Sequence, residues 1–205
     1  MNETKRILLI PTGGTIDSVP YDLDKVPRII TPAENADSIV AATVRKLPGG
    51  EYVDEYTWLG NGRKFIKDSK EFTDKDLQEI ADIMKNDDHR SFIITHGTDQ
   101  MAQNAARLGE YMEGSGKIIV FAGSIVPLSV RPEASDAIPA LTFTLKKISC
   151  QKPGVYVVGH DVQTKRLGFF DPSKVEKDFE ASWDLANQRK NQQLVFREKS
   201  SSPTR

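Results

Sequence analysis

The sequence is poor in cysteine and in long apolar runs. Its single cysteine, Cys150, excludes an internal disulfide framework and any cysteine-rich metal site. Because cysteine is among the most buried residue types, we expect Cys150, at the end of a predicted helix, to be a buried structural thiol. The longest apolar stretch, Ile118–Ala122, is too short to span a bilayer. These absences exclude a disulfide scaffold and a membrane-spanning helix.

The chain also lacks an excess of charge of either sign. Its 28 basic and 29 acidic residues leave a formal net charge of −1, which argues against an electrostatic partner such as nucleic acid or a membrane surface. The histidines and the cysteine show no metal-ligand spacing, so no metal and no other cofactor is predicted. The first residues lack the apolar core of a secretory signal, and we expect a cytoplasmic protein.

What the chain does have is alternation of apolar strands and amphipathic helices. Runs such as Ile7–Ile10 are typical of strands buried on both faces of a parallel sheet. The patterns predict strands over 6–11, 51–59, 91–95, 117–122 and 154–158, and helices over 31–47, 73–84, 99–113 and 132–148. This order predicts an α/β fold with three layers, α/β/α, around a mainly parallel sheet. We expect one domain over residues 1–184 and a polar C-terminal tail over 185–205.

Local signals set several of these boundaries. Thr31 followed by Pro32 is typical of a helix start. Thr73 and Asp76 have the spacing of a capping box, with aspartate in place of the usual glutamate. The segment 17–30 follows neither a strand nor a helix period, and long loops in compact domains often act as lids.

Two turns rich in glycine and hydroxyl groups follow predicted strands. Thr12-Gly13-Gly14-Thr15 follows the first strand, and His96-Gly97-Thr98-Asp99 follows the strand over 91–95. In sheets of this kind ligands bind beyond the carboxyl ends of the strands, so both turns are expected at one site. Glycine there allows close backbone approach and leaves N–H groups accessible to a reacting oxygen.

Other interpretations of the turns remain open. The first turn is also compatible with a phosphate cradle, although it lacks both the third glycine of G-x-G-x-x-G and the Gly-Lys-Ser/Thr of a P-loop. In the second turn Asp99 is a candidate helix cap as well as a ligand. His96 is expected to be structural and to face away from the site.

Taken together, the motifs resemble those of the L-asparaginase/glutaminase family. That family carries T-G-G-T-I-A near its N-terminus, here Thr12–Asp17, and H-G-T-D-T-M after a later strand, here His96–Met101. The segments Asp68–Thr73 and Phe121–Ser129 are similar to its D-S-x-x-M-T and G-S-x-x-P-L stretches. The resemblance covers about residues 5–183, which is the family's N-terminal catalytic domain, and indicates a short-chain member without the smaller C-terminal domain.

The resemblance implies catalytic roles for five residues. Thr15 would be the nucleophile that forms an acyl-enzyme, and Thr98, Asp99 and a lysine would form a second catalytic group. Counting back from Ala181–Trp183 favours Lys174 as that lysine, with Lys177 and then Lys165 as alternatives. Tyr21 is the candidate for the lid tyrosine that contacts the nucleophile.

The resemblance also implies a binding pocket made by Gly14, Ser69, Lys70, Gly97 and Ser124, with Ser69 holding the substrate α-carboxylate. Two departures from the family pattern bear on this pocket. Asp17 replaces the usual alanine and is expected to add a carboxylate at the mouth of the site. Lys70 adds a cation beside the place of the substrate α-amino group. Both departures leave the preferred amide open.

The leading hypothesis from the sequence is an amidohydrolase that releases ammonia from asparagine or a related small carboxamide. A threonine hydroxyl needs activation by a neighbouring base. A lysine serves as that base only when neutral, and otherwise acts as an electrostatic partner. The alternative hypothesis is a catalytically silent domain that binds a small amide or carboxylate. The resemblance further implies a homo-oligomer, either a dimer or a tetramer.

Overall fold

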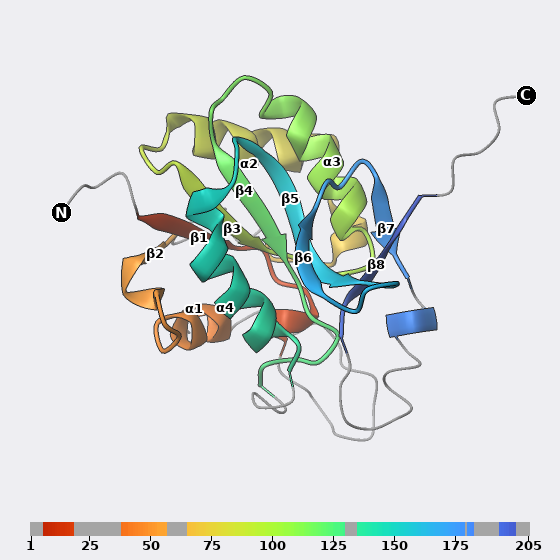
Figure 1. Ribbon diagram of the computed structural model, residues 1–205. Coiled ribbons are helices and arrows are strands. Elements are labelled where there is room, and N and C mark those ends of the chain that lie inside the picture. Colours follow the sequence, from red (N-terminus) through yellow and green to blue (C-terminus); the bar gives the residue numbers. More distant parts are fainter. Residues whose placement is uncertain are drawn as a thin grey trace, which may run out of the picture.

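Apolar runs of the sequence become the central strands of one mainly parallel sheet (Figure 1). The computed structural model describes residues 6–18, 38–56, 65–129, 135–178, 180–182 and 193–199. Its strands are β1 (Ile7–Pro11), β2 (Val53–Glu55), β3 (Ser91–Thr95), β4 (Ile118–Ala122), β5 (Gly154–Asp161), β6 (Leu167–Phe170), β7 (Val175–Lys177) and β8 (Val195–Glu198). They lie in the order β2-β1-β3-β4-β5-β8-β7, with β6 paired to β5. Only the pairings of β6 with β5 and of β7 with β8 are antiparallel among the described strands.

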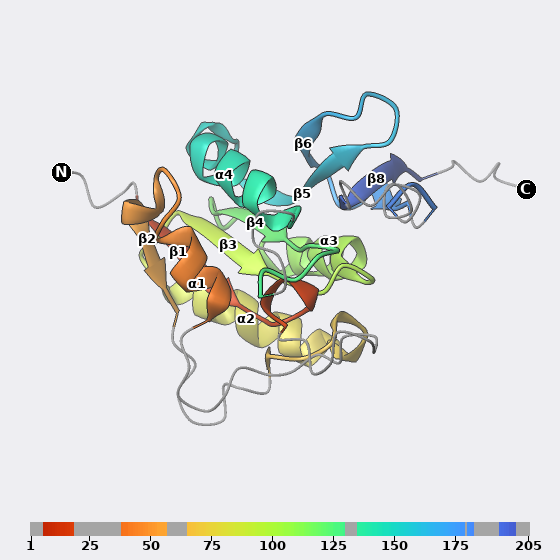
Figure 2. The same cartoon turned by 90° about the horizontal axis from the view of Figure 1, so that it is seen from below.

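Helices cover both faces of the sheet. The pair α1 (Ile39–Val44) and α4 (Ala137–Lys147) lies on one face, and α2 (Asp74–Asn86) and α3 (Met101–Tyr111) lie on the other (Figure 2). Strand β1 shows why: Leu8 and Ile10 pack in the core beneath α2 and α3, while Leu9 packs with α1 and α4. Side chains of a strand point alternately to the two faces, so a continuous apolar run needs cover on both. The predicted three-layer fold is confirmed.

The start of α2 follows from its sequence. The hydroxyl of Thr73 accepts a hydrogen bond from the Asp76 backbone N–H, and the Asp76 carboxylate accepts one from the Thr73 N–H at 2.7 Å. The predicted capping box is therefore present with aspartate in the place of glutamate. Beyond it, Leu77, Ile80 and Met84 are buried on one face of the helix.

Residues of the predicted tail belong to the sheet. Strand β8 lies between β5 and β7, and Leu194, Val195 and Phe196 are buried. The ring of Phe196 packs against Gly159, where an added Cβ would lie 2.6 Å from a ring carbon. The prediction of a polar tail from residue 185 is therefore wrong for 193–199. Three apolar residues in a polar stretch are too few to show a periodicity, and the strand pairs with His160 and Asp161 at the end of β5.

Two smaller expectations also change, and a third is not tested. Cys150, in the short 3-10 helix Ile148–Cys150, is exposed rather than buried. Helix α3 begins at Met101 after Gln100, so Asp99 does not act as its cap. The predicted helix start at Thr31 and Pro32, and the predicted loop beyond Ser18, lie outside the described residues. Within the described part of the chain, no helix is both long and apolar enough to cross a membrane.

Candidate active site

The parallel register brings the two motif turns to one edge of the sheet. Pro11 pairs with Thr95 and Thr95 with Ala122, so the residues that follow β1, β3 and β4 leave the sheet at the same level. Just past the strands, the backbone N–H of Thr12 donates to the Thr95 carbonyl at 3.1 Å, and that of His96 donates to the Ala122 carbonyl at 2.9 Å. The edge is the one at which this class of sheet binds ligands.

The turns touch through their glycines. Gly14 has a φ of 85°, and a Cβ built on it would lie 2.4 Å from the Gly97 nitrogen. A Cβ on Gly97 would in turn lie 2.9 Å from the Ser69 hydroxyl oxygen. Both approaches require a residue without a side chain. The structure thereby brings together Gly14, Gly97 and Ser69, three residues that the sequence predicts for the binding pocket.

The two threonines expected to act chemically flank this contact. Thr15 follows Gly14 directly, begins the short 3-10 helix Thr15–Asp17 and is half-buried. Thr98 follows Gly97, is buried, and its methyl group would lie 2.9 Å from a Cβ built on Gly123. The close packing of three strand-end turns fixes both threonines beside the same backbone junction.

Lys177 is the lysine that reaches Thr98. Its Nζ lies 2.9 Å from Thr98 Oγ1 and 2.9 Å from Asp99 Oδ1, and its side chain is only 7% exposed. Lys174 is 77% exposed and pairs with Asp171 at 3.4 Å, while Lys165 lies in the exposed turn between β5 and β6. The lysine at Thr98 is therefore the alternative Lys177 and not the favoured Lys174, because β7 ends at Lys177 and the side chain of that residue reaches Thr98.

A second lysine binds the other oxygen of the same carboxylate. Lys70 Nζ lies 2.7 Å from Asp99 Oδ2, and its side chain is 61% exposed. Burial raises the pKa of Asp99, but hydrogen bonds from Lys70 and Lys177 outweigh it, so the pKa lies below its usual value. The pKa of Lys70 is raised by its hydrogen bond to Asp99 and by the negative charge of the Asp99 carboxylate. Asp99 is therefore a carboxylate held between two lysines.

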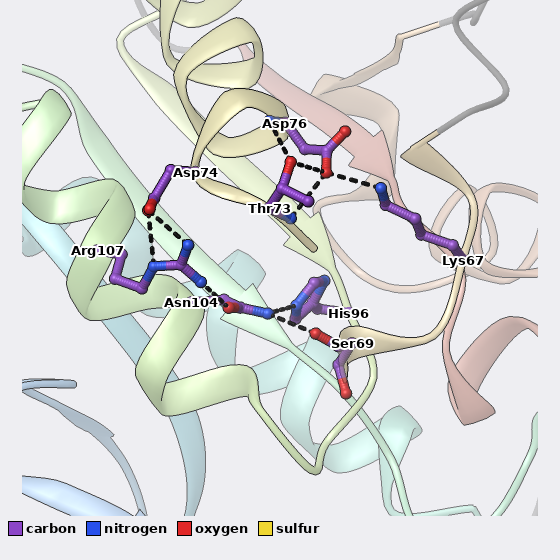
Figure 3. Close-up of polar contacts among 8 residues, drawn as sticks. All are labelled: Lys67, Ser69, Thr73, Asp74, Asp76, His96, Asn104 and Arg107. Carbon is purple, nitrogen blue, oxygen red and sulfur yellow. Dashed lines mark hydrogen bonds and ion pairs between the residues drawn. The ribbon is translucent and has the colours of Figure 1, made fainter. Parts of the chain in front are cut away.

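A series of hydrogen bonds links the second turn to α3 and to the Ser69 segment through Asn104 (Figure 3). Asn104 Nδ2 donates to the Ser69 carbonyl at 2.8 Å and lies 2.9 Å from His96 Nε2. On the other side of the ring, His96 Nδ1 lies 2.9 Å from Thr12 Oγ1, and that hydroxyl donates its hydrogen to the Thr95 carbonyl.

This chain of contacts assigns the tautomer of His96. The Thr12 hydroxyl has one hydrogen and donates it to the Thr95 carbonyl, so its oxygen accepts a hydrogen bond from His96 Nδ1–H. His96 Nε2 then carries no hydrogen and accepts from the Asn104 side-chain amide. Complete burial lowers the pKa of His96 to about 3, so the ring is neutral. His96 supports the turn, in agreement with the structural role expected of it. The sequence did not single out Asn104, although a buried polar residue on the apolar face of a helix was a usable signal.

Two expected site residues have other partners. Asp17 accepts hydrogen bonds from Ser38 Oγ at 3.0 Å and the Val40 backbone N–H at 3.3 Å, and it is buried. Asp17 therefore binds the start of α1. The expectation that it adds a carboxylate at the mouth of the site is wrong. Ser124 donates its hydroxyl to the Val126 carbonyl at 2.9 Å within its own turn. Tyr21 lies outside the described residues.

The fold and this edge define an α/β protein with paired hydroxyl-bearing turns and a lysine–carboxylate pair. Residues 6–178 match the sequence model of a family described as "Asparaginase, N-terminal". Over 129 residues, 62% of this chain, the sequence is 41% identical to L-asparaginase 1 of Escherichia coli K12. The chain spans 36% of the length of that relative. It belongs to the asparaginase family through the family's N-terminal domain.

Solved structures of L-asparaginases share the fold of this chain. L-asparaginase I from Vibrio cholerae matches 84% of this chain with a TM-score of 0.59 and 25% identity, over 48% of its own length. The thermostable L-asparaginase from Thermococcus kodakarensis matches equally well at 26% identity, over 47% of its length. A structure from Campylobacter jejuni named a probable cytoplasmic L-asparaginase shares the fold, with a TM-score of 0.56 at 20% identity.

Proposed function

We propose that this protein is an amidohydrolase that releases ammonia from a small carboxamide through an acyl-enzyme on Thr15. The observation that carries the proposal is the contact of Lys177 with both Thr98 and Asp99, directly beyond the Gly14–Gly97 junction that holds Thr15. A hydroxyl, a positioned acid–base group and backbone N–H donors are the parts that acyl transfer requires. The names of the matching relatives support the same chemistry.

The proposed reaction uses these groups in two steps. The Thr15 hydroxyl attacks the amide carbon while its proton passes to the Thr98–Lys177 pair, and the amide nitrogen takes up a proton and leaves as ammonia. Water then replaces Thr15 at the acyl carbon. Backbone N–H groups of the two turns stabilise the oxyanion, and each such donor lowers a barrier of this kind by about 2.7–4 kcal/mol.

The direct test compares threonine variants in an assay of ammonia release from L-asparagine and related amides. We expect Thr15→Ala and Thr98→Ala to abolish turnover while the far-ultraviolet circular dichroism stays unchanged. Thr142→Ala, a half-buried threonine of α4, is the matched control and is expected to remain active. Near-normal ammonia release by either of the first two variants would contradict the proposal.

The pairing of Lys70 with Asp99 favours a second candidate, a domain that binds a small amide or carboxylate without turning it over. In this case calorimetry detects binding while mass spectrometry detects no product. Ammonia release by the purified chain would exclude it. The cytoplasmic location stays a prediction from the sequence. So does assembly into a homodimer or homotetramer, which light scattering on the purified chain measures directly.

A further inference from the structure

Lys70 places a cation on the solvent-facing side of Asp99, the carboxylate of the second turn. Asp99 presents one oxygen to Lys177, whose side chain is 7% exposed, and the other to Lys70, whose side chain is 61% exposed. The two lysine Nζ atoms lie at 2.9 Å and 2.7 Å from the carboxylate, so each of its oxygens already has a lysine nitrogen within hydrogen-bond distance. A ligand that approaches from solvent meets the Lys70 side of this arrangement.

This arrangement decides which ligand charges the site accepts. A substrate that carries an ammonium group beside Thr98 would have to displace Lys70 from Asp99 or lie against the Lys70 ammonium group. Like charges at this separation repel, and the repulsion is stronger at a partly buried site than in water. Asp17, an acidic residue two positions after Thr15, accepts a hydrogen bond from Ser38 and is buried. It therefore offers no replacement partner for an ammonium group.

A carboxylate on the ligand fits the same place. The Lys70 ammonium has three N–H donors, of which the contact with Asp99 needs one. The neighbouring Ser69 hydroxyl accepts a hydrogen bond from the Gln100 backbone N–H at 3.3 Å, so its own hydrogen can be donated to a ligand oxygen. Both groups belong to the short 3-10 helix Ser69–Glu71, which packs against Gly97.

We propose that Lys70 makes this site select carboxamides that carry a carboxylate but no α-ammonium group, the half-amides of dicarboxylic acids. The proposal rests on the amidohydrolase function and adds its substrate class. A half-amide such as succinamate carries a charge of −1, whereas asparagine is a zwitterion whose ammonium group competes with Lys70. Hydrolysis of the half-amide adds one water and yields the dicarboxylate and an ammonium ion, so the total charge stays at −1.

The experiment measures kcat and KM of the full chain for succinamate and for L-asparagine. We expect kcat/KM for succinamate to exceed that for L-asparagine by at least tenfold. Lys70→Gln should shift this ratio at least tenfold toward L-asparagine, mainly through KM. Lys70→Arg keeps the charge and should retain the preference. Lys75→Gln, which removes an exposed lysine of α2 that is not part of the site, should leave the ratio unchanged.

Binding separates a failure of this inference from a failure of the proposed function. Calorimetry on Thr15→Ala gives the dissociation constants for both compounds without turnover. If no amide is hydrolysed but succinamate binds at least tenfold more tightly, the hydrolase proposal fails and the selection by Lys70 stands. The inference is overturned if L-asparagine is preferred in both assays, if Lys70→Gln leaves the ratio unchanged, or if neither compound binds.

Discussion

Gly14 and Gly97 come from strands more than eighty residues apart, yet a methyl group on Gly14 would lie 2.4 Å from the Gly97 nitrogen. The contact joins the turn that carries Thr15 to the turn that carries Thr98. Backbone atoms cannot move aside as the end of a flexible side chain can. The geometry of the proposed reaction therefore depends on the absence of a single carbon atom.

Replacing Gly14 with alanine should destabilise the protein and abolish activity together. Gly14 has a φ of 85° and a ψ of 179°, a region that is essentially restricted to glycine, so a residue with a Cβ costs roughly 1–3 kcal/mol there, and overpacking adds about 1–3 kcal/mol. Urea unfolding measures the sum. Gly114→Ala is the matched control, because its φ of 72° is similar but the added methyl would meet no atom within 4 Å. Equal losses in the two variants would show that the contact with Gly97 does not matter.

Variants of Lys177 and Lys174 test which lysine completes the site. We expect Lys177→Met to lower kcat for amide hydrolysis by roughly 10²–10⁴-fold, the usual contribution of a positioned acid–base group. Lys174→Met should change kcat less than twofold, because that side chain is 77% exposed. The reverse result would restore the assignment expected from the sequence.

Lys177→Arg distinguishes two roles for this residue. Arginine keeps the positive charge beside Asp99 but does not give up its proton. Activity close to that of the unaltered chain would show that Lys177 acts through charge and hydrogen bonding. A loss as large as that of Lys177→Met would show that it transfers a proton. Steady-state ammonia release is sufficient for both measurements.

His96 should make the protein less stable in acid. Its folded pKa is about 3 and its ordinary value is 6.5, so the unfolded chain binds a proton across this window while the folded protein does not. The free energy of unfolding should therefore fall by about 1.4 kcal/mol for each pH unit below 6.5 through this residue. In urea titrations from pH 7 to pH 4, His96→Gln should show a smaller fall. Parallel curves for the two proteins would contradict the assignment.

Asp136 should have the opposite effect. It is buried beneath the turn after β4 and accepts backbone N–H groups of Ile125, Val126 and Leu194. Burial raises its pKa to about 6, although these hydrogen bonds lower it. Because the folded protein then holds a proton that the unfolded chain releases, this contribution to stability is full below about pH 4 and is lost as the pH rises through 6.

Asp136→Asn removes that titration. Between pH 4 and pH 7 the free energy of unfolding of the unaltered chain should fall by roughly 2–3 kcal/mol relative to the variant. Any fixed cost of the amide, whose NH₂ group cannot accept the three N–H groups, shifts the whole curve and leaves this slope difference intact. A constant difference between the two proteins across the pH range would refute the prediction.

The sequence by itself determined the three-layer fold, most strands and the edge of the sheet at which the turns meet. Apolar periodicity and glycine turns are local signals, and the burial of a run such as Ile7–Ile10 leaves few arrangements open. Glycine and threonine at the strand ends were therefore sufficient to locate Gly14, Gly97 and Thr98.

Only the tertiary structure decided the partners of the charged side chains. Lys174 and Lys177 look alike in sequence, and the pairing of β7 with β8 turns the second toward Thr98. Asp17 lies in the first motif, yet its carboxylate accepts hydrogen bonds from Ser38 and Val40 at the start of α1. A long charged side chain reaches groups from several elements, and which one it meets depends on contacts between segments far apart in the chain.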